Sequence, residues 1–205
     1  MVQQSINMTR QELKQMWFNL PTSKVVSKTI LVKMDKYKDR LDEIVNAMNK
    51  IKDLALDKIL NEVVLEDKKP ILGICLGMQL LCNYSEEDGG AQGLGYVDAE
   101  CRKFSKENLK VPHVGFNQVI LNSNTKLYDG FNKDSDFYFV HSYRLQSDRD
   151  INQSHCNYQE DFIASFEQSN IVGTQFHPEL SQTNGLKILK NLSALLQFFY
   201  MIIIK

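Results

Sequence analysis

The apolar positions in the first third of the chain follow a helical spacing. Leu41, Ile44, Val45, Met48 and Ile51 recur as one face of a helix, with charged residues between them. The pattern predicts an amphipathic helix here and a second helix that runs through about residue 64. A Thr-x-x-Glu capping box predicts a short helix over 9–19, and an apolar run predicts a strand at 29–32.

After residue 70 the pattern changes to short, continuous apolar runs. Such runs are typical of buried strands, and the first of them, at 71–74, leads directly into a helix-like segment at 76–82. Further strands are predicted at 118–121, 137–140, 162–166 and 171–175, with a closing helix over 186–199. Strands mixed with helices, and a strand that feeds directly into a helix, predict an α/β layered domain.

Composition narrows this picture to one globular domain. The 205 residues are 43% apolar with a formal charge of −1, which excludes a disordered chain and gives no field to attract nucleic acid or a membrane. The first residues lack the apolar run of a signal peptide, and the uncharged stretch 191–204 is shorter than the ~20 residues of a spanning helix. We therefore expect a cytoplasmic protein whose closing helix docks on the core and whose apolar tail, 201–204, contacts a partner.

Cysteine and glycine are placed unevenly. The cysteines at 75, 82, 101 and 156 form no C-x-x-C pair and have no histidine at metal-finger spacing, so we expect no metal, no cofactor and no disulfide framework. All ten glycines lie at or after position 73. An average usage of about 7% would place roughly five in the first 72 residues.

The segment Gly73-Ile74-Cys75-Leu76-Gly77 has the G-x-nucleophile-x-G pattern of a nucleophile elbow. Glycine on both sides lets the strand and the helix approach closely, while the central side chain points outward. At a helix amino terminus the thiolate of Cys75 is favoured, and the N–H of Leu76 points to where an oxyanion would form. The alternative is a small buried thiol beside two packing glycines, and this segment alone does not decide between the two.

A second motif, Phe176-His177-Pro178-Glu179, follows the strand predicted at 171–175. In an extended segment residues i and i+2 project to the same side, so Glu179 can accept a hydrogen bond from one imidazole nitrogen of His177 and leave the other available. A His-Pro-Glu segment alone is more often a turn than a catalytic pair. Together with the cysteine elbow it predicts a nucleophile with its base.

These motifs, read from Gly73 to Gln79 and from Gln175 to Glu179, resemble the signatures of class I (triad) glutamine amidotransferases. The stretches V-P-H-V-G-F-N at 111–117, F-V-H-S-Y at 139–143 and G-L-G at 93–95 are similar to the glutaminase subunit of imidazole glycerol phosphate synthase. The resemblance covers roughly 70–191 of a single domain spanning 1–205, and 1–45 diverge from it. It implies an α/β layered fold with a mostly parallel central sheet flanked by helices.

The same resemblance implies a role for each site residue. Cys75 would be the nucleophile, His177 its general base and then acid, and Glu179 the carboxylate that orients it, while Leu76 offers the oxyanion N–H. The implied glutamine-binding residues are Gln79, Glu87, Ser142 and Tyr143. Glutamine would be hydrolysed to glutamate and ammonia, and the ammonia would pass to a (β/α)₈-barrel cyclase subunit that makes imidazole glycerol phosphate in histidine biosynthesis.

The chain departs from the family in its first third. The family opens with a D-Y-G-x-G-N turn and later supplies a P-G-x-G loop, whereas L-V-K-M-D at 31–35 stands about where that loop belongs. The loop gives the second backbone donor of the oxyanion hole, and losing one donor costs on the order of 10²–10³ in rate. Two smaller departures are Phe116, where tryptophan is usual, and Leu180, where a basic residue is usual.

Three interpretations therefore stay open. The chain is a glutaminase subunit for histidine biosynthesis with intact or reduced activity, or a paralogue that supplies ammonia for the amidation of surface sugars. The third alternative is a partner subunit that docks on the cyclase without making ammonia. The intact triad argues against the third, and the missing glycines argue against full activity.

Overall fold

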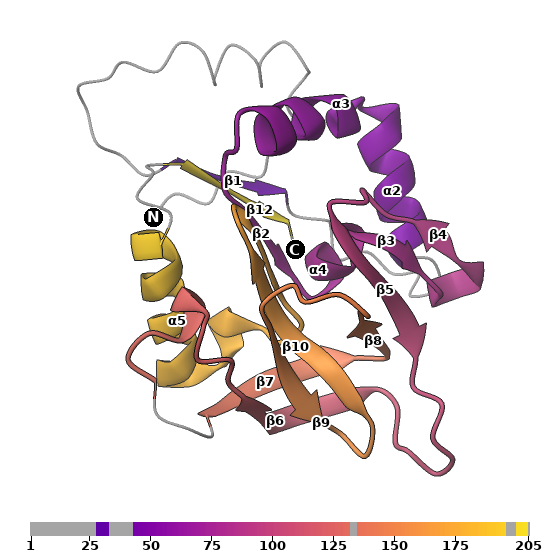
Figure 1. Ribbon diagram of the computed structural model, residues 1–205. Coiled ribbons are helices and arrows are strands. Elements are labelled where there is room, and N and C mark those ends of the chain that lie inside the picture. The colour runs from indigo at the N-terminus through magenta and orange to yellow at the C-terminus, as the bar shows by residue number, and fades with distance from the viewer. Residues whose placement is uncertain (1–27, 33–42, 132–134, 196–199, 205) are drawn as a thin grey trace.

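The strands join into one mixed sheet (Figure 1). The computed structural model describes residues 28–32, 43–131, 135–195 and 200–204. The order along the main path of the sheet is β1-β12-β2-β11-β10-β8-β5-β3-β4, and β6, β7 and β9 branch from it because β9 pairs with β10. The strands are β1 (Lys28–Val32), β2 (Ile71–Ile74), β3 (Cys82–Ser85), β4 (Ala91–Gln92), β5 (Val97–Lys103), β6 (His113–Ile120), β7 (Ser135–His141), β8 (Tyr143–Gln146), β9 (Gln153–Asn157), β10 (Asp161–Gln168), β11 (Ile171–Thr174) and β12 (Tyr200–Ile204).

One side of the sheet is parallel and most of the rest is antiparallel. β1, β12, β2 and β11 run parallel in that order, and β3 pairs in parallel with β5. Every other pairing among the described residues is antiparallel. The α/β class is confirmed, but the structure corrects the expected proportion, because the sheet is mixed rather than mostly parallel. The connections β9–β10 and β10–β11 are only a few residues long, and such short connections join antiparallel strands.

Two apolar cores lie on opposite faces of the sheet (Figure 1). α2 (Glu43–Asp53), α3 (Leu56–Leu60), the π-helical turn η1 (Asn61–Glu66) and α4 (Leu76–Leu80) pack on one face, and α5 (Gln182–Leu195) with the short helix η3 (Lys126–Tyr128) packs on the other. Along β2 the side chains alternate between the two cores, since Ile71 belongs to the first and Leu72 and Ile74 to the second. A strand buried on both faces needs a continuous apolar run, as the sequence has here.

The helical spacing at 41–51 predicts α2 correctly. Ile44, Met48 and Ile51 are buried on its inner face. The helix expected through residue 64 is divided into α3 and η1, with Ala55 in a left-handed conformation between α2 and α3. The capping-box helix at 9–19 lies outside the described residues.

The C-terminal tail is the main difference from expectation. The closing helix starts earlier, at Gln182, and the apolar tail is not a free partner-binding extension: Tyr200–Ile204 forms β12, between β1 and β2. Ile202 and Ile204 are buried there. A run of β-branched residues suits a strand covered on both faces, which explains why this tail enters the sheet. Within the described residues, no helix has the length and apolar character needed to cross a membrane.

Candidate active site

Cys75 occupies a strained turn between β2 and α4. Its φ of 52° and ψ of −105° lie in a region that side-chain-bearing residues rarely adopt. The flanking glycines are required by contact: a Cβ on Gly73 would lie 2.6 Å from the backbone of Gly77, and one on Gly77 would lie 1.9 Å from the carbonyl oxygen of Ile204. The thiol is partly exposed at the amino end of α4, so the structure has the backbone geometry of a nucleophile elbow.

His177 and Glu179 form a hydrogen-bonded pair just past the end of β11. Nδ1 of His177 lies 3.0 Å from Oε1 of Glu179, and since the carboxylate can only accept, Nδ1 carries the proton. In the neutral ring Nε2 is then unprotonated, and it is buried with no hydrogen-bond partner in the described part of the chain. Ser181 holds the backbone here, because its hydroxyl donates to the His177 carbonyl and accepts from the N–H of Tyr138. The ring therefore presents a nitrogen without a partner in the described part of the chain.

The parallel pairing of β2 with β11 brings the elbow and this pair to the same edge of the sheet. Thr174 pairs with Ile74, and the N–H of Cys75 donates to the Thr174 carbonyl at 2.8 Å. The carboxyl ends of neighbouring parallel strands are the common position of sites in such sheets. The three residues that the sequence groups as a triad, Cys75, His177 and Glu179, thus come from adjoining strand ends.

Two neighbours of the Cys75 sulfur were not predicted from the sequence. Sγ lies 3.6 Å from the carbonyl oxygen of Val140 at the end of β7, and 3.7 Å from Nε2 of Gln175. Gln175 stands inside the Q-F-H-P-E motif, and only the register of β11 against β2 shows that its side chain reaches the thiol. Val140 stands inside the F-V-H-S-Y stretch, but nothing in that stretch indicates that its backbone carbonyl contacts a thiol.

Residues at the start of α4 follow the elbow closely. Leu76 opens the helix, so its N–H is one of those with no acceptor within the helix. Gln79 lies one turn later and is 4% exposed, and its Oε1 is buried without a hydrogen-bond partner among the described residues. A buried, unpaired amide oxygen one helical turn from Cys75 is a group that a bound ligand can satisfy.

Ser142 and Tyr143 lie in and after the turn between β7 and β8. They follow Val140, whose carbonyl faces the thiol, and the Tyr143 carbonyl accepts a hydrogen bond from Nδ1 of His141 at 2.7 Å. Glu87 lies earlier in the chain, in the 3₁₀ turn η2 (Glu87–Gly89), where its N–H donates to the Ser85 hydroxyl. Their roles toward glutamine stay predictions.

His113 and His141 form a buried pair beside this turn. Nδ1 of His113 lies 3.0 Å from Nε2 of His141. Because His141 donates from Nδ1 to a carbonyl, its Nε2 carries no proton and accepts a hydrogen bond from His113. The two hydrogen bonds therefore run in one direction, from His113 to His141 and from His141 to Tyr143. Burial lowers the pKa of His113 to about 4 and that of His141 to about 3, so both rings are neutral at pH 7. The pair braces the end of β7.

The other side of the elbow differs from the site that the resemblance implies. Leu31 and Val32, the first two residues of the stretch 31–35 that stands about where the P-G-x-G loop belongs, lie in β1, and β12 stands between β1 and β2. Ile204 of β12 pairs with Gly73, and its carbonyl oxygen faces Gly77. Among the described residues, the backbone nearest this side of the elbow therefore offers a carbonyl and no oxyanion donor.

Four exposed apolar side chains lie on β6, on β7 and in the short turn after His177. Val114, Phe116, Val140 and Leu180 are exposed by 55%, 49%, 38% and 51%, and the ring of Phe116 meets that of Tyr138 edge-on at 5.4 Å between centroids. We call these four residues the apolar rim. Exposed apolar side chains gathered at one place are typical of protein interfaces.

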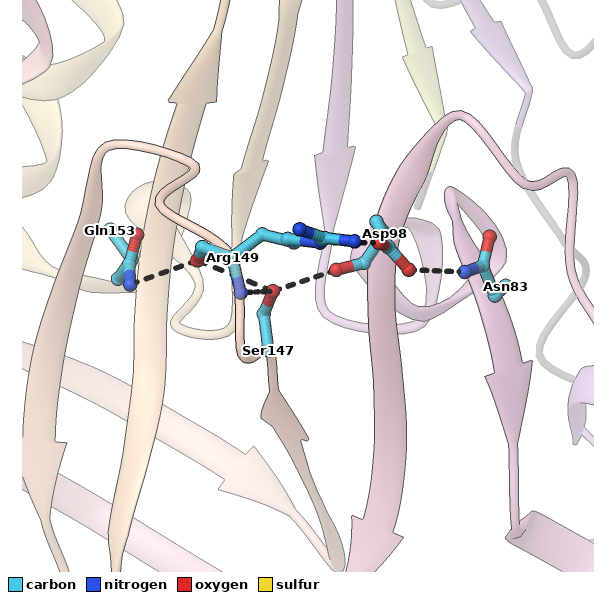
Figure 2. Close-up of polar contacts among 5 residues, drawn as sticks. All are labelled: Asn83, Asp98, Ser147, Arg149 and Gln153. Carbon is cyan, nitrogen blue, oxygen red and sulfur yellow. Dashed lines mark hydrogen bonds and ion pairs between the residues drawn. The ribbon is translucent and has the colours of Figure 1, made fainter.

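A second polar cluster lies away from the triad, on the far strands of the sheet (Figure 2). Asp98 accepts hydrogen bonds from Asn83, Ser147 and Arg149, and Gln153 donates to the Arg149 carbonyl. The cluster borders a cavity of about 610 Å³ that none of the predicted site residues lines. Its Asp98–Arg149 ion pair is exposed and contributes about 0–1 kcal/mol, so we interpret the cluster as a tie between β5 and the β8–β9 loop. In the described part of the chain, no group of histidine, cysteine and acidic residues could hold a metal ion.

Comparison with known proteins shows similarity to one family of enzymes. The family model for glutamine amidotransferase class-I matches residues 31–194. The chain is 45% identical over 150 residues to imidazole glycerol phosphate synthase subunit HisH 1 of Campylobacter jejuni subsp. jejuni serotype O:23/36, covering 73% of this chain and 75% of the relative. It is 37% identical over 167 residues to subunit HisH of Pelagibacter ubique, covering 80% and 77%.

Solved structures agree at the level of the fold. A glutamine amidotransferase crystal structure matches with a TM-score of 0.54 and 13% identity, over 72% of this chain and 71% of that one. A glutamine amidotransferase of Thermotoga maritima matches with a TM-score of 0.50 and 18% identity, over 82% of this chain and 64% of that one. The family match spans most of the chain and includes both strand ends that carry the triad. This chain therefore belongs to the class-I glutamine amidotransferase family.

Proposed function

We propose that this chain is the glutaminase subunit of an imidazole glycerol phosphate synthase and hydrolyses glutamine to glutamate and ammonia. The observation that carries the proposal is the strained Cys75 elbow at one strand end, next to the strand end with the His177–Glu179 pair, whose Nε2 has no hydrogen-bond partner in the described part of the chain. The names of the relatives, which are matched over about three quarters of their own length, support the synthase assignment.

The reaction runs through a thioester on Cys75. The thiol proton moves to Nε2 of His177, and the thiolate attacks the carboxamide carbon of glutamine while Leu76 donates its N–H to the oxyanion. The C–N bond then breaks, and His177 gives its proton to the departing ammonia. Water, deprotonated by His177, attacks the thioester and releases glutamate, and the sulfur takes back a proton.

The acceptor of the ammonia docks, in this proposal, on the apolar rim. The rim borders the strand end from which Val140 contacts the thiol, so a partner seated there would cover the mouth of the site. We propose that this partner is a barrel-shaped cyclase subunit and that the two chains form a cytoplasmic heterodimer. Four free cysteines suit a reducing compartment.

The rate of this glutaminase is expected to be low. A tetrahedral intermediate needs donors on both sides of its oxygen, and L-V-K-M-D at 31–35, about where the family's P-G-x-G loop belongs, has neither glycine nor proline. One missing donor costs on the order of 10²–10³ in turnover.

The test is glutamate release by the purified chain mixed with a cyclase subunit. We expect turnover above the rate of buffer alone, and Cys75→Ala should lower it by at least about 10³-fold because the nucleophile is lost. Cys156→Ala is the matched control, since it removes a buried thiol from β9, a strand that carries none of the triad residues. Equal turnover by wild type and Cys75→Ala would overturn the assignment.

A further inference from the structure

The Cys75 sulfur lies between two polar groups that favour opposite protonation states. The Val140 carbonyl, 3.6 Å away, can only accept, so it pairs with the thiol form. The Gln175 amide nitrogen, 3.7 Å away, donates to sulfur and so pairs best with the thiolate. When Cys75 ionises, its sulfur therefore loses the hydrogen bond to the Val140 carbonyl, and the hydrogen bond from the Gln175 amide becomes stronger.

Gln175 is held in this position by the backbone on both sides. Its own N–H donates to the Ala164 carbonyl at 2.8 Å, which fixes it against β10. The preceding residue, Thr174, accepts the N–H of Cys75, and the following Phe176 stacks on Phe137 with ring centroids 4.2 Å apart. The amide thus points at the sulfur from a rigid strand end.

The Gln175 side chain is fully buried, and its burial is poorly compensated within the protein. Its Oε1 has no hydrogen-bond partner among the described residues, and the contact with Sγ is the only hydrogen bond of its side chain there. Leaving a buried amide oxygen unpaired costs about 1–3 kcal/mol. An apolar residue of similar volume would fill this space without that cost, so packing does not explain the glutamine.

We propose that Gln175 acts directly on the nucleophile, donating its amide N–H to the Cys75 thiolate and holding the sulfur in line for attack. The inference rests on the proposed function, in which Cys75 is the nucleophile. It adds a donor from the β11 side that works with His177: the ring takes the proton, and the amide stabilises the sulfur that remains.

The test measures the ionisation of Cys75 without any turnover. Full-length wild type and Gln175→Leu are alkylated with iodoacetamide between pH 5 and 10, and the modified Cys75 peptide is quantified by mass spectrometry. Because alkylation follows the thiolate, we expect the Gln175→Leu profile to move up by about one pH unit, with about tenfold slower alkylation at pH 7. Thr174→Val is the matched control, since it removes a neighbouring buried hydroxyl that also lacks a partner in the described part of the chain, and it should keep the wild-type profile.

A wild-type profile in Gln175→Leu would overturn the proposal. If that variant does not fold, Gln175→Glu keeps the shape and replaces the donor by a carboxylate, which should raise the profile further; an unchanged profile in Gln175→Glu would equally overturn it. The alkylation readout is separate from glutamine hydrolysis. A wild type that titrates at Cys75 but releases no glutamate would contradict the proposed function and leave the role of Gln175 toward the sulfur standing.

Discussion

β2, the strand that leads into the Cys75 elbow, has two parallel neighbours, and they bring different groups to the elbow. On one side β11 leads into Gln175, whose amide contacts Cys75, and then into the hydrogen-bonded pair of His177 and Glu179. On the other side β12 brings the carbonyl of Ile204 against Gly77. Both strands bury apolar side chains beside β2, so both satisfy its backbone and its packing. Packing needs only apolar side chains along the strands, whereas catalysis also needs hydrogen-bond donors and acceptors at the strand ends.

The largest expected effect is a loss of glutamate release when the β11 side is altered. Glu179→Gln keeps the shape of the pair but lets the side-chain amide donate to Nδ1 of His177, which moves the ring proton to Nε2. A protonated Nε2 cannot take the thiol proton, so we expect glutamate release to fall on the order of 10³–10⁴. The measurement is kcat for glutamate release with the cyclase subunit present.

Glu107→Gln is the control for Glu179→Gln, because it makes the same chemical change at an exposed loop position. If Glu179→Gln kept wild-type turnover, Glu179 would not set the tautomer of His177. The main evidence that the β11 side supplies catalytic groups, whereas the β12 side supplies only packing, would then be lost.

The same contrast separates what the sequence predicts from what it does not. The elbow and the His-Pro-Glu segment are local motifs, so the positions of Cys75, His177 and Glu179 at adjoining strand ends follow from short stretches and from parallel pairing. The place of β12 depends on a pairing between residues about 130 positions apart, Ile202 with Ile71, and no local spacing encodes it. The run Met201–Ile204 reads equally well as the end of a helix, which is why its pattern does not predict a strand.

Gln175 and Val140 show the same limit at smaller scale. Gln175 stands inside Q-F-H-P-E and Val140 inside F-V-H-S-Y, but the contact of each with Cys75 depends on the register of β11 or on the end of β7. The sequence also predicts too much parallel sheet. The strand-to-helix segment at 71–82 lies where the strands do run parallel, whereas the motif stretches at 111–117 and 139–143 lie largely on β6 and β7, which pair antiparallel, and their sequences do not indicate strand direction.

The β12 side should respond to an added donor. The triple variant Val32→Pro, Lys33→Gly and Asp35→Gly restores the P-G-x-G pattern after Leu31. We expect glutamate release to rise by about 10²-fold, because a second oxyanion donor becomes available once β1 ends in this loop. The assay is the same glutamate release with the cyclase subunit.

Alanine at the same three positions is the control for the triple variant, since it alters the chain there without adding glycine. A gain in the alanine variant would mean that the native side chains obstruct the site. No gain in either variant would show that the intervening β12, and not the loop sequence, limits the β12 side.

The smallest expected effect is on the pH dependence of stability, through the buried histidine at the end of β7. This strand contacts the β11 side. Tyr138 of β7 accepts the N–H of His177, and His141 ends the strand with a pKa lowered to about 3 by burial. A lowered pKa means that the unfolded chain binds a proton on His141 below pH 6.5 when the folded chain does not, so stability rises with pH in this window. The contribution is fully present above about pH 6.5 and is lost as the pH falls toward the folded pKa of about 3.

Urea unfolding at pH 7, 6 and 5 measures this contribution as a slope. Wild type should lose free energy of unfolding as the pH falls, by at most about 1.4 kcal/mol per pH unit from one histidine. His141→Phe keeps a ring in the cluster with Phe104, Phe139 and Phe162 but cannot titrate, so its stability should fall less steeply, whatever its value at pH 7. His155→Ala changes an exposed histidine on β9 and should keep the wild-type slope. Parallel slopes for wild type and His141→Phe would mean that His141 does not couple protonation to folding.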